Sequence, residues 1–171
     1  GDKLWEIPGS TTDCVTSTVT DGQLIYTSGG YPRNHVAAVH ADGSGKIAWD
    51  NNTRVYVPSM IVRDKHLYGV TDAGVATCWV AATGEEVWKG RLGGTFSASP
   101  VLVGDLLFAT NEEATTFVFK ANPEAFELVA KNQLGEIQFA SPIICGNRLY
   151  LRAASRVDGR RQETLYAIGK Q

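Results

Sequence analysis

Residues 59–90 read SMIVRDKHLYGVTDAGVATCWVAATGEEVWKG. Short apolar runs in this stretch are separated by turn residues, among them Asp64-Lys65 and Gly84. Runs of this length that are rich in β-branched and aromatic residues, and bounded by turn residues, are typical of β-strands. We therefore expect a hairpin, a third strand, a glycine turn and a fourth strand that ends near Trp88.

The same pattern recurs along the whole chain. The segments STVTDGQLIYT, SMIVRDKHLYG, SPVLVGDLLFA and SPIICGNRLYL begin at Ser17, Ser59, Ser99 and Ser141, with spacings of 42, 40 and 42 residues. The same spacings are kept by a repeated aromatic residue (Tyr26, Tyr68, Phe108 and Tyr150) and by a turn residue (Gly22, Asp64, Gly104 and Gly146). Four strands in each repeat of roughly 40 residues, arranged radially, are the β-propeller solution to the problem of exposed sheet edges.

The second half of the repeat ends in a tryptophan. A turn glycine precedes Trp49 and Trp88 by four residues, at Gly45 and Gly84. Glycine permits backbone conformations that other residues rarely adopt. A tryptophan on the outer strand can cover the junction with the next blade and bury on the order of 150–250 Å². Trp5 matches the same position of a repeat, so we assign these three tryptophans and two glycines to the structural repeat.

We predict an all-β chain that forms a single β-propeller domain, complete or partial, over residues 1–171. It has four four-stranded blades, in repeat units of approximately 14–52, 53–94, 95–134 and 135–171. The fourth unit stops after its third strand, and Lys3–Ile7 resembles a fourth strand without its three partners. We therefore expect residues 3–7 to supply the closing outer strand.

The pattern A-x-x-G-x-x-x-W at residues 81–88, matched at its glycine and tryptophan by residues 42–49, resembles the tryptophan-docking repeat of the quinoprotein alcohol dehydrogenase-like propellers. The chain as a whole is similar to bacterial PQQ-like repeat proteins. Because members of this family usually carry seven or eight blades, the resemblance implies about half of such a ring. A closed four-blade ring, a homodimer that completes eight blades, and a segment of a longer chain all fit, and the start midway through a blade favours the last.

Composition excludes several classes of function. The chain is 43% hydrophobic, which excludes a disordered chain, and its 16 basic against 18 acidic side chains give a net charge of −2. This charge argues against binding to nucleic acid or to an anionic membrane surface. No apolar run approaches the ~20 residues of a membrane helix, so we expect no transmembrane segment. The state of Cys14, Cys78 and Cys145 stays open, because three cysteines cannot all pair within one chain.

The sequence favours a binding role over an enzymatic one. Enzymes of the family that the chain resembles use pyrroloquinoline quinone (PQQ) and calcium, with two adjacent cysteines, whereas no two cysteines here are adjacent. Asp72, Asn111, Glu112 and Glu113 are the acidic or amide candidates for a central funnel, and turn geometry explains them equally well. We assign no catalytic or metal-binding residue and expect no cofactor. The alternative is part of a PQQ-dependent dehydrogenase, with calcium, whose active site needs further blades.

A candidate interaction surface lies on the loops. The segment RAASRVDGRRQE at residues 152–163 is the longest connection between second and third strands. It holds four arginines, which can pair with the carboxylates of an acidic partner, and the segments that link the blades add three aromatic residues. The candidate residues are Arg152, Arg156, Arg160, Arg161, Tyr56, Phe96 and Phe139.

These observations predict a non-catalytic propeller scaffold for protein or ligand binding. By analogy of fold, its nearest counterpart is the propeller lipoprotein that scaffolds the bacterial outer-membrane barrel-assembly machine. The resemblance implies an exported protein that is periplasmic or membrane-attached. We expect a protein partner.

Overall fold

The computed structural model describes residues 1–7 and 11–169. Its described residues form strands and turns but no helix, and so contain no helix long enough to cross a membrane. The strands build four antiparallel sheets, which we call blades one to four in chain order. The all-β class predicted from the sequence is confirmed.

Each blade is a meander in which strands that follow one another in the sequence are hydrogen-bonded neighbours. Blade one contains β1 (Val19–Thr20), β2 (Leu24–Gly29), β3 (His35–His40) and β4 (Ile47–Asn51). Blade two contains β5 (Ile61–Arg63), β6 (His66–Val70), β7 (Val75–Val80) and β8 (Glu86–Arg91). Blade three contains β9 (Val101–Val103), β10 (Leu106–Thr110), β11 (Thr115–Lys120) and β12 (Leu128–Gln133). Blade four contains β13 (Ile143–Cys145), β14 (Arg148–Val157) and β15 (Arg160–Ile168).

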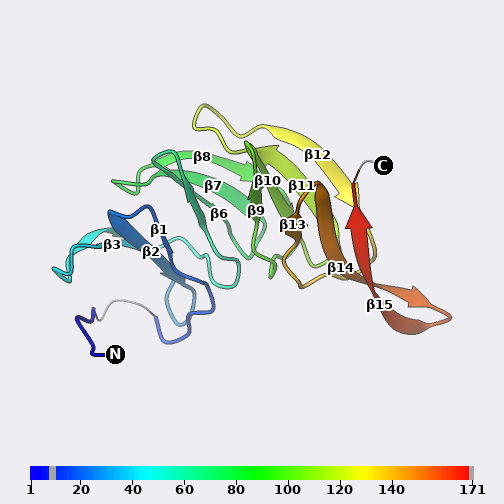
Figure 1. The fold of residues 1–171 in the computed structure, drawn as a ribbon, viewed down its shortest axis with the longest axis horizontal. Helices are drawn as coiled ribbons and strands as arrows, with labels where there is room; N and C mark the ends of the chain where they lie inside the picture. Colours follow the sequence, from blue (N-terminus) through cyan, green and yellow to red (C-terminus); the bar gives the residue numbers. More distant parts are fainter. Residues whose placement is uncertain (8–10, 170–171) are drawn as a thin grey trace.

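The blades follow one another along an open arc, with blade one in blue at one end and blade four in orange and red at the other (Figure 1). This arrangement confirms a partial propeller. A four-blade ring closed within the chain is wrong, because blades one and four do not meet.

The predicted closing strand needs a correction. Blade four has three strands among the described residues, and Lys3–Ile7 form no strand pairing. Instead, Trp5 and Ile7 lie against the outer face of blade one, where they line a pocket with Ile25 and Val39. The physical reason is reach: in an open arc the outer edge of β15 lies at the far end of the molecule from this segment.

The core lies between the blades. Tyr26 of blade one packs with Met60, Leu67 and Trp79 of blade two in one hydrophobic cluster. Tyr68 and Trp88 of blade two pack in the same way with Leu107 and Phe117 of blade three in a second cluster. In both junctions the face that carries the repeated aromatic residue covers the opposite face of the next blade. Burial of this apolar area drives the stacking of the blades.

A series of serines crosses every junction within the chain. The Ser17 N–H donates to the Ser59 Oγ at 3.0 Å, and the Ser59 N–H donates to the Ser99 Oγ at 2.9 Å. The Ser99 N–H then donates to the Ser141 Oγ at 2.9 Å. The serine column that reveals the repeat in the sequence therefore joins each blade to the next, which explains why its spacing is nearly constant.

The outer-strand tryptophans also cross the junctions. The Trp88 indole N–H donates to the Asn122 carbonyl oxygen at 2.8 Å, so blade two is tied to the turn that precedes β12. Gly45 and Gly84 both have a positive φ, of 69° and 73°. A Cβ atom at Gly84 would come within 2.5 Å of the Trp49 ring, so glycine is required there both by conformation and by close approach.

Candidate interaction surface

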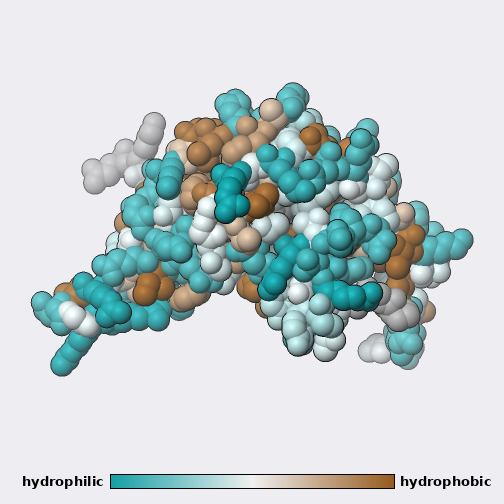
Figure 2. Space-filling view, turned by 180° about the vertical axis from the view of Figure 1, so that it is seen from behind, coloured by the Kyte–Doolittle hydropathy of each residue, from teal (hydrophilic) through white to brown (hydrophobic). Residues whose placement is uncertain are grey.

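The most extended element of the molecule is the hairpin of β14 and β15. β14 has 10 residues and β15 has 9, whereas the equivalent strands of blade three have 5 and 6. Asp158 and Gly159 connect them with φ angles of 51° and 74°, the positive values that a two-residue type I′ turn requires. The segment 152–163, expected as a loop, is therefore mostly strand. The hairpin projects beyond the body of the molecule, as a largely hydrophilic extension (Figures 1 and 2).

The pairing register decides which arginines share a face. Arg156 lies directly opposite Arg161, and Arg152 lies on the same side of β14 as Arg156 because side chains alternate along a strand. Arg160 lies opposite Val157 on the other face. The structure therefore places three of the four predicted arginines together and separates the fourth from them.

Ion pairs engage only part of this charge. Glu163 forms one ion pair with Arg152 at 3.2 Å and another with Arg161 at 2.8 Å. In the part of the chain that the structure describes, no carboxylate lies within ion-pair distance of Arg156 or Arg160. Directly opposed like charges on a hairpin are unfavourable, so the Arg156–Arg161 pair costs stability when no anion is bound.

Phe139 joins the arginines at the base of the hairpin. It is 51% exposed and lines a small pocket together with Arg152, Arg161 and Glu163. Its segment is anchored by the Gln138 N–H, which donates to the Glu112 carbonyl oxygen at 3.0 Å. An exposed aromatic ring beside arginines is the residue combination that protein interfaces favour.

Tyr56 lies elsewhere, in the segment between blades one and two. Its ring lies 5.5 Å from the Arg54 guanidinium carbon, and its N–H donates to the Asp72 Oδ2 at 3.0 Å. The ring is half-buried and also packs over Gly30. The structure therefore places Tyr56 in a local cluster apart from the arginine hairpin.

Phe96 needs a correction. It is 1% exposed and its ring packs against Phe117, with the centroids 6.0 Å apart, inside the core between blades two and three. A side chain that is buried in this way cannot form part of an accessible binding surface. Phe96 stabilises the junction instead.

Three of the four residues that were candidates for a central funnel accept hydrogen bonds within the chain. Both Asp72 carboxylate oxygens accept backbone N–H groups, from Tyr56 and from Val57. The Asn111 Oδ1 accepts the Thr115 N–H at 2.9 Å, and the Glu112 Oε1 accepts the Ser97 hydroxyl at 2.5 Å. These oxygens hold turns and links in place. Within residues 1–7 and 11–169, no group of three or more His, Cys, Asp or Glu side chains is placed to hold a metal ion.

The cysteines occupy three separate environments. Cys78 is buried in the second cluster, and burial raises the pKa of its thiol to about 11. Cys145 is exposed on blade four, and the Cys14 thiol donates to the Thr11 carbonyl oxygen at 3.4 Å. Cys78 is therefore a core residue by its burial. Its raised pKa also makes the thiol a poor nucleophile at neutral pH.

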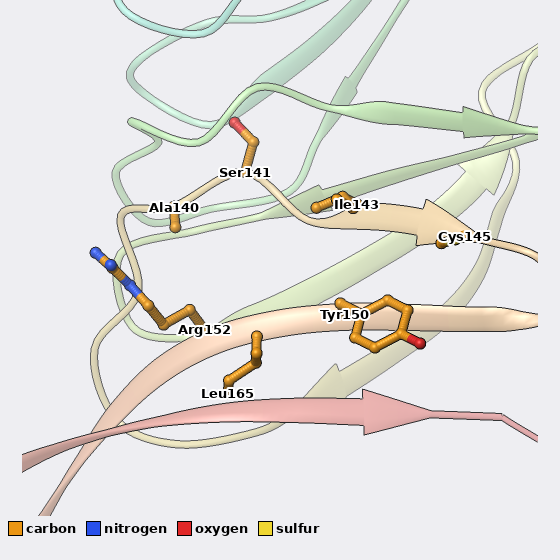
Figure 3. Close-up of a pocket in the computed structure, with 7 residues that line it drawn as sticks. All are labelled: Ala140, Ser141, Ile143, Cys145, Tyr150, Arg152 and Leu165. Atoms are coloured by element: carbon orange, nitrogen blue, oxygen red, sulfur yellow. The ribbon is translucent and has the colours of Figure 1, made fainter.

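The sequence did not identify the open face of blade four as a candidate site. A shallow pocket of about 520 Å³ lies on this face, lined by Ile143, Tyr150 and Leu165 among others (Figure 3). Ile143 is 57% exposed and Leu165 is 69% exposed, although both occupy sheet positions that face the next blade elsewhere in the arc. The missing fourth strand was the sequence signal that could have indicated it.

Comparisons with known proteins agree with this architecture. A family model described as outer membrane protein assembly factor BamB matches residues 1–89 and, in a second match, residues 32–164. No curated protein sequence matches the chain.

Solved structures share the fold at low sequence identity. The crystal structure of BamB from Moraxella catarrhalis has a TM-score of 0.63 and 12% identity, over 81% of this chain and 40% of that chain. The computationally designed Ika4 protein has a TM-score of 0.74 and 13% identity, over 99% of both chains. The computationally designed Ika8 protein has a TM-score of 0.67 and 11% identity, over 90% of this chain and 45% of that chain.

The chain therefore spans less than half the length of the BamB and Ika8 chains that it resembles. Identities of 11–13% support the shared fold and nothing finer. The family match covers most of the chain, and the blades have the arrangement that the family implies. The chain belongs to the PQQ-like repeat β-propeller family whose model is described as outer membrane protein assembly factor BamB.

Proposed function

We propose that this chain is a non-catalytic scaffold whose β14–β15 hairpin binds an acidic segment of a partner protein. The observation that carries the proposal is the opposed pair Arg156 and Arg161 on an exposed projection, with Arg160 at the same tip but on the other face. Carboxylates of a partner would relieve the repulsion within this pair and form bidentate, charge-assisted hydrogen bonds with the guanidinium groups.

The aromatic residue beside the arginines adds an apolar contact. Phe139 and Arg161 line the same pocket at the base of the hairpin. A segment that carries acidic residues next to an aromatic or aliphatic one would place its carboxylates on the arginines and its apolar side chain on Phe139. Such a mixed contact contributes more affinity than charge alone, because the apolar part is not screened by salt.

The hairpin is suited to binding because it is ordered before a partner arrives. Its strands are paired without interruption from Leu149↔Ile168 to Val157↔Arg160. A preorganised surface loses little conformational entropy on association, which favours affinity. The proposed function requires no cofactor.

The family description supports a cellular setting. BamB is described as an outer membrane protein assembly factor, and we propose that this chain acts in the periplasm, exported and close to the outer membrane. Its proposed partner is therefore a protein with an acidic segment that is accessible from that compartment.

The test measures binding of a defined peptide. A fluorescein-labelled peptide of alternating Asp and Glu residues with one central Trp is titrated with the 171-residue chain, and its anisotropy is recorded. Substitution of Arg156, Arg160 and Arg161 by Ala should weaken binding by about tenfold or more, because several charge-assisted hydrogen bonds are lost. Phe139→Ala should weaken binding less than the triple arginine variant does. It should also make the peptide affinity fall more steeply as the salt concentration rises.

A matched variant controls for net charge. Substitution of Arg33, Arg91 and Arg148 by Ala also removes three exposed arginines, but none from the projecting part of the hairpin. The control should bind the peptide nearly as tightly as the unmodified chain. Equal weakening in both triple variants would show that the peptide responds to overall charge, and the proposed site would be rejected. Thermal unfolding of both variants verifies that the fold is intact.

A further inference from the structure

The three junctions within the chain share one hydrogen bond, and the first two share two further features. The N–H of one serine donates to the hydroxyl of the next serine. At the first two junctions a tryptophan on the outer strand also donates to a carbonyl group of the next blade, and the repeated aromatic face is covered. A blade that packed on the free side of blade four would be expected to form the same contacts.

Among residues 135–169, blade four has none of them on its free side. Ser141 accepts a hydrogen bond from the Ser99 N–H, and its hydroxyl points toward blade three in Figure 3. By analogy with Ser17, Ser59 and Ser99, its own N–H would donate to a fifth serine of the series. Among the described residues β15 has no outer strand beside it, and the Tyr150 face carries the open pocket.

Blade one carries the complementary parts. The Ser17 hydroxyl is the first of the series, so among the described residues no serine of a preceding blade donates to it. Trp5 and Ile7 lie against blade one without pairing in a strand. A Cβ atom at Gly43 would lie 3.7 Å from the Trp5 ring, in the turn equivalent to the one where Trp49 covers Gly84. Trp5 thus already covers the turn of blade one, as an outer-strand tryptophan of a preceding blade would.

We propose that two copies of this chain form one ring, in which blade one of each copy docks on the open face of blade four of the other. The Ser141 N–H of one copy then donates to the Ser17 hydroxyl of the second copy. Residues 3–7 of the second copy become the fourth, outer strand of blade four, beside β15. This proposal does not rest on the proposed function, although Arg152 of the hairpin also lines the open pocket of blade four.

The register of this added strand follows from the blades that are complete. Trp49 pairs with Ala38 and Trp88 pairs with Cys78, each opposite the residue that pairs with the repeated aromatic. In blade four the residue that pairs with Tyr150 is Ala167. Trp5 of the second copy therefore pairs with Ala167, and its small side chain leaves room for the indole ring as Ala38 does.

Closure with two copies agrees with the comparisons of fold. The matched part covers 90% of this chain and 45% of the designed Ika8 chain, so that chain is about twice as long. Contacts between different faces produce a closed ring when the rotation fits and an open filament when it does not. Two copies related by a two-fold axis make the same contact twice and leave neither face open.

The first measurement is the solution mass by light scattering over about a hundredfold range of concentration, because dimerisation follows mass action. We expect about twice the 18.5 kDa of one chain at the upper end of the series. A monomer throughout, or a mass that keeps growing with concentration, would overturn the closed two-copy ring. The variant with Ala at Arg156, Arg160 and Arg161 should still dimerise. Dimerisation of this variant would show that the ring forms whether or not the hairpin binds an acidic peptide.

Variants then test which faces meet. Ile143→Asp with Leu165→Glu puts two charges on the open face of blade four and should weaken dimerisation by about 100-fold, because charges buried without partners are unfavourable. Leu128→Glu is the matched control, since Leu128 is also exposed but lies on the outer strand of blade three. Both side chains of the double variant are exposed in one chain, so folding should be unaffected. Unchanged dimerisation in the double variant would contradict the proposed interface.

The thiol of Cys145 provides an independent readout. It lines the open pocket of blade four, whereas Cys78 is buried. Its strand position is that of Arg63, whose guanidinium donates to the Gly104 carbonyl oxygen of the next blade. In a Cys14→Ser background, labelling of Cys145 by a maleimide should slow at least about tenfold as the chain dimerises, by exclusion of the reagent from the interface. Labelling at the same rate at all concentrations would count against the ring.

Discussion

The indole N–H of Trp49 donates a 2.8 Å hydrogen bond to the carbonyl oxygen of Ala81, across the junction between blades one and two. The same ring covers Gly84, at the turn that follows Ala81. One side chain therefore supplies apolar burial and a polar anchor to the neighbouring blade. Trp88 repeats the arrangement with Asn122, at the next junction.

Trp88 allows the two contributions to be separated. Trp88→Phe keeps an aromatic ring among Tyr68, Phe119 and Phe126 but loses the hydrogen bond to Asn122. It should lower the free energy of unfolding by about 1–3 kcal/mol, the cost of leaving a carbonyl group without its donor. Trp88→Ala also leaves a cavity and should cost about 3–5 kcal/mol. Urea denaturation followed by circular dichroism measures both.

The control for this comparison is Trp5→Phe, with unfolding measured at a protein concentration where the chain is monomeric. Trp5 is 38% exposed, so the same chemical change should cost less than about 0.5 kcal/mol there. Equal losses at positions 5 and 88 would mean that the indole group does not anchor the junction.

Gly84 and Gly104 distinguish close approach from backbone conformation. Both have a positive φ, but a Cβ atom at Gly84 would meet the Trp49 ring at 2.5 Å, whereas one at Gly104 would meet nothing within 4 Å. Gly104→Ala should cost about 1–2 kcal/mol through the left-handed conformation alone. Gly84→Ala should cost more, and it should change Trp49 fluorescence. A similar loss of stability for both variants, measured by denaturation, would exclude a role for the Trp49 contact.

The repeat made most of the fold predictable. The columns of Ser17, Tyr26 and Gly22 recur in four segments, and each column has a structural partner in the next blade or turn. A pattern of this kind is visible in sequence because every blade solves the same local packing problem. The alternation that predicts strands also places the repeated aromatic residues on one face of each sheet.

Features that depend on distant geometry were not predictable. Phe96 lies in a link without strand alternation, so its sequence context does not show that it packs on Phe117. The pairing of residues 3–7 depends on how far the arc closes, which no local pattern contains. The segment 152–163 was expected to be a loop because it is rich in arginine and contains the turn Asp158-Gly159. It instead forms parts of two long strands on either side of that turn. The arginines themselves were found from the sequence, and the structure adds their division between two faces.

Arg156 should lower stability while it supports binding. Replacement by Thr removes the repulsion with Arg161 and introduces a residue that favours strands. Arg156→Thr should therefore stabilise the hairpin by about 0.2–1 kcal/mol, measured as slower amide hydrogen exchange in β14 and β15. The same variant should bind the acidic peptide more weakly. Faster exchange, or unchanged peptide affinity, would contradict the assigned role of the opposed pair.

His35 should make stability depend on pH. It is buried on β3, and burial lowers its pKa below the usual 6.5, as Arg33 also does, while Asp50 raises it. The unfolded chain therefore binds a proton near pH 6.5 that the folded chain resists. The contribution of His35 to stability is complete above about pH 6.5 and is lost as the pH falls toward the lower pKa of the folded chain. Urea denaturation from about pH 8 to about pH 5 should show this loss, and His35→Asn should remove it. An identical decline in the variant would assign the pH dependence to other groups.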